Sequence, residues 1–375
     1  MRILMASDLY YPFLLGGGET RMYETARRLV EKHEIHVLTR RFKGLPSYEV
    51  HEGVHIHRVF VPSAGIKLES PSDGSAFMAG ALLKGLNLGD FDLYAPQQFF
   101  PIFPLWLIAK AKRKPLVATI HDVYRETWLQ KYGFKGCLMA AFEKVMLKFP
   151  YAKIITVSSS SKKKLIESSV SGHRIEIIPN GVDVGKYDGV KVEKSDRPRV
   201  IYVGRLIGYK HVDDLLVAFS RLDLDAELYI VGEGSERKNL EALRRELKID
   251  HKVTFTGFVD ERKKIELLKS SHVLVLPSTT EGFGIALIEA MAARTSVLAT
   301  DIPALRELVE DGENGLLFKP RDINELKTKL ELLLKDKGLQ DKFSRGGHDL
   351  VGREFTWDRV AERVEEVHND LINRA

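Results

Sequence analysis

The chain has 375 residues, enough for two domains, and its hydrophobic content of 44% and charged content of 29% are those of a folded globular protein. Its single cysteine, Cys137, excludes an intramolecular disulfide, and the absence of any apolar run of about 18 residues excludes a predicted transmembrane helix. The apolar run before Asp8 is too short for a signal peptide, so we expect a cytoplasmic protein.

The net charge of +5 is unevenly distributed along the chain. Residues 1–188 carry 26 Lys and Arg against 18 Asp and Glu, whereas the remainder carries 31 against 34. A basic half can attract anionic lipid head groups or phosphorylated acceptors, and a solvated face of mixed charge explains it equally well. No nucleic-acid-binding motif accompanies the charge, so we expect no nucleic-acid partner.

The first forty residues predict a β-loop-α-β unit, which is a Rossmann-like beginning. Its three glycines are contiguous, so the G-x-G-x-x-G dinucleotide fingerprint is absent. The amides of Gly17 and Gly18 can instead approach a phosphate closely, and a plain flexible turn is the alternative. The expected elements are a strand at 3–6, a loop at 12–18, a helix at 20–30 and a strand at 34–40.

Two further patterns suggest metal sites, and both have simpler explanations. His55 and His57 share one face of a strand predicted at 51–60, and two such histidines can bind a metal. No carboxylate or cysteine stands nearby at ligand spacing, so we interpret them as surface histidines. Asp223 and Asp225 form a D-x-D between a predicted helix and strand, which we interpret as a turn.

The strand predicted at 115–124 ends in His121 and Asp122, on the edge where doubly wound sheets bind ligands. His121 there can hydrogen-bond a sugar hydroxyl or a charge that develops in a transition state. Alternatively, Asp122 caps the next helix and His121 packs beside it. The following amphipathic stretch, 136–153, fits either an anionic membrane surface or an ordinary core-facing helix with snorkelling lysines.

The polar stretch Lys186–Pro198 predicts a domain boundary, after which a second β-α alternation begins. In VGRLIGYK, Arg205 and Lys210 lie just beyond a strand, where a guanidinium and an ammonium group can both reach a diphosphate. Two cations at that position can replace a metal ion.

The segment 278–292, STTEGFGIALIEAMA, follows a buried strand and leads through a glycine turn into an apolar helix. Glu289 lies in this apolar helix and needs hydrogen-bond donors, which a sugar or ribose diol would supply. Glu281 stands in the loop before the helix, where Gly282 and Gly284 let backbone amides approach a ligand. Alternatively, Glu281 is an acid at a helix start and Glu289 is partly solvated.

The segments GGGE, PNGVD, VGRLIGYK and EGFGIALIE, in this order, resemble the motifs of the retaining nucleotide-sugar-dependent glycosyltransferases of family 4 (glycosyl transferases group 1). This resemblance implies an α/β GT-B fold, with two Rossmann-like domains whose parallel sheets face each other across a cleft. It implies an acceptor-binding domain at 1–187 and a nucleotide-sugar donor domain at 188–354. The terminal segment 355–375 would cross back to the first domain and bury Val360, Val364, Val367 and Leu371.

The family resemblance also implies roles for the motif residues. His121 and Glu281 would be catalytic. Glu289 would bind the ribose, while Gly282 and the backbone of Phe283, Gly284 and Ile285 would bind the donor sugar. The diphosphate would contact Arg205, Lys210, Gly17 and Gly18.

We expect a hexosyl transfer that needs no metal or cofactor, from a UDP-, GDP- or ADP-sugar to a carbohydrate, lipid-linked or phosphorylated acceptor. A peripheral contact with an anionic membrane at the inner face remains an alternative to a freely cytoplasmic location. A sugar-nucleotide epimerase of the same architecture and a non-catalytic nucleotide-sugar-binding protein are the rival functions. A glycogen-type phosphorylase is disfavoured, because no lysine motif for pyridoxal phosphate is apparent. The sequence does not identify the base, the sugar, the acceptor or the oligomeric state.

Overall fold

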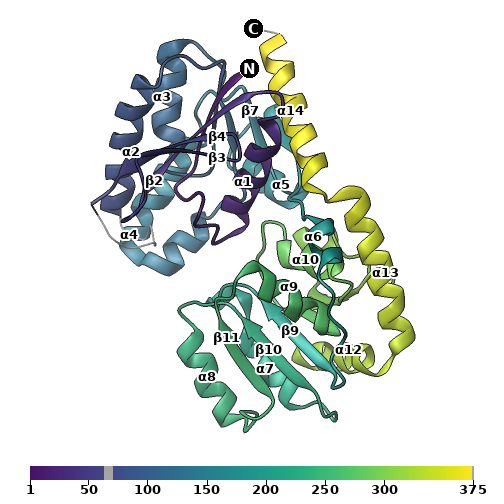
Figure 1. Ribbon diagram of the computed structural model, residues 1–375. Coiled ribbons are helices and arrows are strands. Elements are labelled where there is room, and N and C mark those ends of the chain that lie inside the picture. Colours follow the sequence, from purple (N-terminus) through teal and green to yellow (C-terminus); the bar gives the residue numbers. More distant parts are fainter. Residues whose placement is uncertain (63–70, 374–375) are drawn as a thin grey trace. The chain divides into compact units, whose positions relative to one another are not determined.

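The computed structural model describes residues 1–62 and 71–373 (Figure 1). Contacts divide the chain into two compact units: unit 1 is Met1–Asn180 with Trp357–Ala375, and unit 2 is Gly181–Thr356. Each unit is an α/β fold around mainly parallel strands, which confirms the predicted fold class. The units divide before the polar stretch Lys186–Pro198, because α6 (Val184–Gly189) already packs on α10 (Ile285–Ala292) of unit 2.

Unit 1 contains a sheet of strand order β3-β4-β2-β1-β5 and a smaller sheet of order β6-β7-β8. Among the described strands of unit 1, only the β3–β4 pair is antiparallel. Isolated parallel bridges, Tyr94 to Leu116 and Gln97 to Thr119, connect the two sheets into one continuous layer. The strands are β1 (Arg2–Ala6), β2 (Glu34–Arg41), β3 (Tyr48–His51), β4 (Val54–Phe60), β5 (Leu93–Pro96), β6 (Val117–Thr119), β7 (Lys153–Thr156) and β8 (Ile175–Ile177).

Helices pack on this layer and bury an apolar core that includes Leu4, Phe77, Tyr94 and Ile108. The last helix, α14, lies along α1 (Figure 1), and Lys32 of α1 pairs with Glu365 of α14 at 2.9 Å. The chain's final helix therefore belongs to unit 1. The helices are α1 (Gly17–Leu29), α2 (Pro71–Asn87), α3 (Ile102–Lys112), α4 (Arg125–Met146), α5 (Ser159–Glu167), the 3-10 turn η1 (Gly172–Arg174) and α14 (Trp357–Asn373).

Unit 2 is built on a six-stranded parallel sheet of order β11-β10-β9-β12-β13-β14. Strands β12 and β13 of this sheet are mainly apolar and completely buried, as expected where helices cover both sides. The strands are β9 (Arg199–Val203), β10 (Glu227–Val231), β11 (Val253–Gly257), β12 (Val273–Leu276), β13 (Ser296–Thr300) and β14 (Leu316–Phe318). Besides α6 and α10, the helices are η2 (Gly208–Lys210), α7 (Val212–Ser220), α8 (Arg237–Glu246), α9 (Glu261–Ser270), α11 (Pro303–Arg306), α12 (Ile323–Lys335) and α13 (Lys337–Glu354).

Several predicted elements have different bounds. Helix α1 begins at Gly17 rather than residue 20, so two of the three glycines form its first turn. The strand predicted at 51–60 is a hairpin, because Glu52 and Gly53 adopt positive φ angles of 46° and 79° and turn the chain between β3 and β4. The buried stripe of α14 continues through His368, whereas Val367 and Leu371 are only half-buried.

The interpretation of His55 and His57 as surface histidines is wrong. His57 is buried, and the parallel pairing of β2 with β4 sets His36 opposite His55. His36 could not be recognised as a neighbour of His55 from the sequence, because the two strands are separated along the chain. The D-x-D residues do form a turn, between α7 and β10, where Asp225 pairs with Arg197 at 2.5 Å.

Of the predicted amphipathic helix 136–153, residues 136–146 are the second half of α4, which begins at Arg125 and ends at Met146, and Lys153 already begins β7. The loop predicted at 62–74 ends earlier, because α2 begins at Pro71, and its residues 63–70 lie outside the described residues. In the described part of the chain, no helix combines the length and hydropathy needed to cross a bilayer.

Candidate functional site

The predicted donor-binding residues of unit 2 lie at the topological switch point of its sheet, where the order of the strands reverses. The chain runs from β9 outward to β10 and β11, then returns to β12 and runs outward the other way to β13 and β14. The loops that follow β9 and β12 therefore diverge at the carboxyl edge, which is where open α/β sheets bind ligands. These two loops, 204–211 and 277–284, contain Arg205, Lys210 and Glu281.

Hydrogen bonds connect the loops of this edge to one another. The amide of Thr279 donates to the carbonyl of Tyr209 at 3.0 Å, joining the two loops of the switch point. The amide of Leu206 donates to the carbonyl of Glu233 at 2.9 Å, joining the loop after β9 to the loop after β10. The edge is therefore a fixed scaffold, on which side chains keep their relative positions.

One carboxylate and two cations gather at the switch point. Lys210 forms an ion pair with Glu281, and their side chains are only 12% and 10% exposed. Arg205 is exposed on the same loop and donates from Nη2 to the hydroxyl of Tyr209 at 3.1 Å. This arrangement offers an anionic ligand one accessible cation and a second cation that is already held in place by a carboxylate.

The turn into α10 places backbone amides at the same edge. Gly284 caps the helix with a left-handed φ of 97°, and a Cβ there would lie 2.6 Å from Cδ2 of Leu305. Only glycine fits this position without strain. Phe283 is buried and packs edge-to-face on Phe355, with ring centroids 5.9 Å apart, so its backbone rather than its ring is available to a ligand. The first amides of α10, beginning at Ile285, have no partner within the helix.

The carboxylate of Glu289 already has a protein donor, which differs from the sequence prediction that a ligand must supply one. Lys264 of α9 donates to Oε1 of Glu289 at 2.6 Å, and both side chains are largely buried. No pattern in the sequence pointed to this lysine, because α9 and α10 are neighbours only in the folded unit. The second oxygen, Oε2, has no partner among the described residues.

The predicted site residues of unit 1 lie at the corresponding switch point, between β1 and β5. Gly17 and Gly18 begin α1 after β1, with Gly16 as an N-cap that has no side chain to cover the first amides. A Cβ at Gly18 would lie 3.0 Å from Nε2 of Gln97 and 3.4 Å from Nε2 of His121. The structure thus brings together the segments that follow β1, β5 and β6.

His121 has an imidazole nitrogen with no protein partner. Its Nε2 is buried and has no hydrogen-bond partner in the described part of the chain. Burial lowers the pKa of His121 to about 3, and the nearby guanidinium of Arg21 acts in the same direction. The ring is therefore neutral at physiological pH. The carboxylate of Asp122 accepts two hydrogen bonds from Lys164, both 2.9 Å, and one from the amide of Val123 at 2.8 Å.

Sequence reasoning missed two residues of this group, Gln97 and Arg21. Arg21 is 2% exposed, and its Nη1 donates to the carbonyl of Pro179 at 2.7 Å and to Oδ1 of Asn180 at 3.1 Å. It fixes α1 to the start of the PNGVD segment. The sequence could have pointed to Arg21, because it lies beside the apolar stripe of α1, where a charged side chain needs polar partners.

Two family models match successive parts of the chain. The model described as Glycosyltransferase Family 4 matches residues 15–186, and the model described as Glycosyl transferases group 1 matches residues 184–349. Among curated proteins, the phosphatidyl-myo-inositol mannosyltransferase of Mycobacterium leprae is 30% identical over 331 residues, which are 83% of this chain and 84% of that protein.

Solved structures share the whole fold. The sucrose-phosphate synthase of Thermosynechococcus elongatus superposes with a TM-score of 0.85 at 21% identity, covering 100% of both chains. The HepE protein of Anabaena in complex with UDP-glucose superposes with a TM-score of 0.80 at 19% identity, covering 99% of this chain and 100% of the other. These neighbours are GT-B proteins, so the chain has the GT-B fold.

Proposed function

The chain belongs to the glycosyl transferases of group 1 and family 4, and from that membership we propose that it transfers a hexosyl group from a nucleotide diphosphate sugar to an acceptor hydroxyl with retention of configuration. The transferase activity follows from the family, and the proposal concerns the donor, the acceptor and the mechanism. The observation that carries it is the group formed by Arg205, Lys210 and Glu281 at the switch point of unit 2.

The two cations would hold the donor diphosphate. Arg205 is exposed and its forked guanidinium matches two phosphate oxygens, while Lys210 would exchange Glu281 for a phosphate oxygen when the donor binds. Glu281, released from the lysine, would accept hydrogen bonds from hydroxyls of the donor sugar. Glu289 would use Oε2 for a ribose hydroxyl while Lys264 keeps Oε1.

In the reaction, the bond between the anomeric carbon and the diphosphate oxygen breaks and leaves an oxocarbenium-like centre. Arg205 and Lys210 neutralise the charge on the departing diphosphate, which is the electrostatic task usually given to a metal ion, so we propose that transfer needs no metal. The acceptor hydroxyl attacks from the face that the diphosphate leaves, and its proton passes to a phosphate oxygen. The amides of Gly17 and Gly18 and the ring of His121 would contact the phosphate and the reacting sugar.

We further propose a lipid-linked acceptor at an anionic membrane surface. The name of the Mycobacterium leprae relative specifies phosphatidyl-myo-inositol, which is a lipid. In unit 1 the second half of α4 exposes Leu138 and Val145, which are 69% and 58% exposed. Exposed Lys144 is the neighbour of Val145, and exposed Lys148 lies just beyond the end of the helix. Exposed apolar side chains flanked by cations are typical of interfacial helices. A soluble sugar acceptor is the alternative.

Thermal-shift measurements with UDP, GDP and ADP and their sugar conjugates would test the donor site, because a ligand of the native state raises its stability. We expect one nucleotide family to raise the melting temperature equally with magnesium and with EDTA. Turnover of that sugar nucleotide should then require an acceptor. Isomerised donor formed without any acceptor would favour an epimerase, and binding without turnover would favour a non-catalytic protein.

Vesicle sedimentation would test the membrane contact separately. The protein should sediment with anionic vesicles, remain in solution with zwitterionic ones, and be released by salt. Replacing Leu138 and Val145 with serine should weaken sedimentation without changing the melting-temperature shift by the nucleotide. Equal binding to both kinds of vesicle would contradict the proposal.

A further inference from the structure

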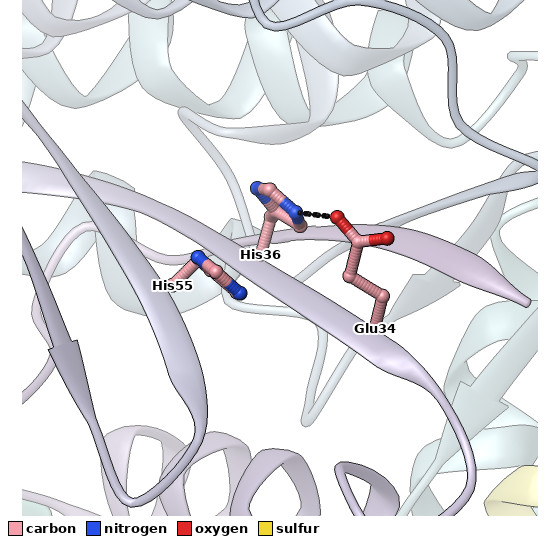
Figure 2. Close-up of side chains that lie close together, drawn as sticks. All are labelled: Glu34, His36 and His55. Atoms are coloured by element: carbon pink, nitrogen blue, oxygen red, sulfur yellow. Dashed lines mark hydrogen bonds and ion pairs between the residues drawn. The ribbon is translucent and has the colours of Figure 1, made fainter.

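The amino edge of the unit 1 sheet carries a cluster of side chains that neither the family nor the proposed reaction uses. Glu34 and His36 lie on β2, and His55 lies opposite His36 on β4. Figure 2 shows the three side chains close together, with His36 Nε2 2.8 Å from Oε1 of Glu34. One possible ligand atom from each residue lies within 4.8 Å of the others.

We propose that Glu34, His36 and His55 form a binding site for a divalent transition-metal ion of the zinc type. Two imidazoles and one carboxylate are a ligand set that zinc uses when a fourth position is left to water. The side chain of Glu34 is 50% exposed, so an ion can enter from solvent, whereas His36 is buried and its ring position is fixed by the surrounding sheet.

The hydrogen bonds around the cluster suit this role. A metal-bound histidine needs its second ring nitrogen held by a hydrogen-bond partner, which fixes the tautomer. Nδ1 of His36 lies 2.9 Å from Nε2 of His57, which can accept a hydrogen bond from the Nδ1–H group and so leave the lone pair of His36 Nε2 for the ion. Nδ1 of His55 lies 2.8 Å from the hydroxyl of Tyr48, which leaves His55 Nε2 for the ion.

The carboxylate of Glu34 is held from its other side. Nε of Arg2 donates to Oε1 of Glu34 at 2.9 Å, and the guanidinium lies 4.6 Å above the ring of Phe91. Oε2 of Glu34 has no hydrogen-bond partner among the described residues and is available to the ion. The rings of His36 and His55 lie nearly parallel, with an interplanar angle of 11°, so coordination requires the half-buried ring of His55 to tilt toward the carboxylate about its hydrogen bond with Tyr48.

The position of the cluster indicates a structural rather than a catalytic ion. Glu34 and His55 stand at the amino ends of β2 and β4, whereas the glycines near His121 follow the carboxyl end of β1 in the same parallel layer. An ion at the cluster would join β2 to β4, raise the stability of unit 1 and leave transfer chemistry unaffected. The inference therefore stands independently of the proposed donor site.

Titration of the full chain with zinc, after treatment with a chelator and dialysis, would test the site. We expect one zinc ion per chain by calorimetry, a rise in melting temperature on binding, and a visible absorption band when cobalt replaces zinc. Glu34→Gln and His55→Ala should each weaken zinc binding by more than about 100-fold, and Tyr48→Phe should weaken it by about 10–100-fold. His251→Ala, which removes an exposed histidine of unit 2, is the matched control and should bind zinc like the parent chain.

Glu34 is half-exposed, so the Glu34→Gln variant should fold, and its unfolding in the absence of metal checks this directly. Saturable zinc binding that is unchanged in both Glu34→Gln and His55→Ala would overturn the proposal, as would the absence of stoichiometric binding by the parent chain. Zinc that is displaced by UDP would also overturn it, because that result would place the ion at the nucleotide site.

Discussion

Replacing Lys210 with methionine tests whether its ion pair with Glu281 stabilises unit 2 as well as serving the donor. Methionine keeps the apolar length of the side chain but leaves the nearly buried carboxylate of Glu281 without its cation. Removing one partner of a fully buried ion pair costs about 3–5 kcal/mol. Because these side chains keep 12% and 10% of their exposure, we expect a loss of about 2–3 kcal/mol in the free energy of unfolding. For a unit of this size, that loss lowers the melting temperature by about 5–10 °C.

Arg205→Met is the matched control, because Arg205 is an exposed cation on the same loop. It should change the free energy of unfolding by less than about 0.5 kcal/mol, while both variants lose about 100-fold or more in turnover. Urea unfolding and nucleotide release measure the two effects separately. Adding Glu281→Gln to Lys210→Met should recover most of the lost stability. The reasoning is refuted if Lys210→Met unfolds at the same urea concentration as the parent chain, or if Arg205→Met keeps full turnover.

Three other substitutions, one of them with a matched control, probe single features of the two switch points. Gly284→Ala should lower the free energy of unfolding by about 1–3 kcal/mol in a urea assay, because Gly284 has a left-handed φ and the added Cβ would contact Leu305. Gly208→Ala is the control and should change this free energy little, because a Cβ at Gly208 would meet no atom within 4 Å. Gly18→Ala should reduce turnover more than stability, since the added methyl group points at His121; equal losses in both assays would assign this glycine a structural role. The folded-state pKa of His121, about 3, lies below its ordinary value of 6.5, so its contribution to stability is complete above pH 6.5 and is lost as the pH falls toward 3. His121→Asn should flatten that part of the stability profile, and an unchanged profile would contradict the assignment.

The sequence predicted those features of the fold that repeat along the chain. Alternation of buried strands with amphipathic helices fixed the fold class, and the glycine turns before α1 and α10 located both switch points. The positions of Arg205, Lys210 and Glu281 could be predicted to meet, because residues just after parallel strands share one edge of the sheet. The confirmed family membership came from the order of short motifs rather than from any one residue.

The partners of individual side chains could not be predicted. Glu289 was expected to need a ligand, but Lys264 satisfies it across two helices whose adjacency depends on the strand order of unit 2. His55 was expected to lie on the surface without a carboxylate nearby, but the register of β2 with β4 brings His36 and Glu34 to it. Register between parallel strands is decided by packing over the whole layer, so a linear pattern does not reveal such neighbours.

Because α14 belongs to unit 1, that unit cannot be completed during translation until unit 2 has been synthesised. The ribosome releases residues 1–180 first, then all of unit 2, and only afterwards the helix that pairs Glu365 with Lys32 and Asp358 with Arg28. At a synthesis rate of about 5–20 residues per second, unit 2 takes about 9–35 s to complete. During this time the face of α1 that α14 will cover is still exposed to water. Unit 2, which is continuous in the chain, can finish before the unit that precedes it, so a helix synthesised after unit 2 completes the unit that was started before it.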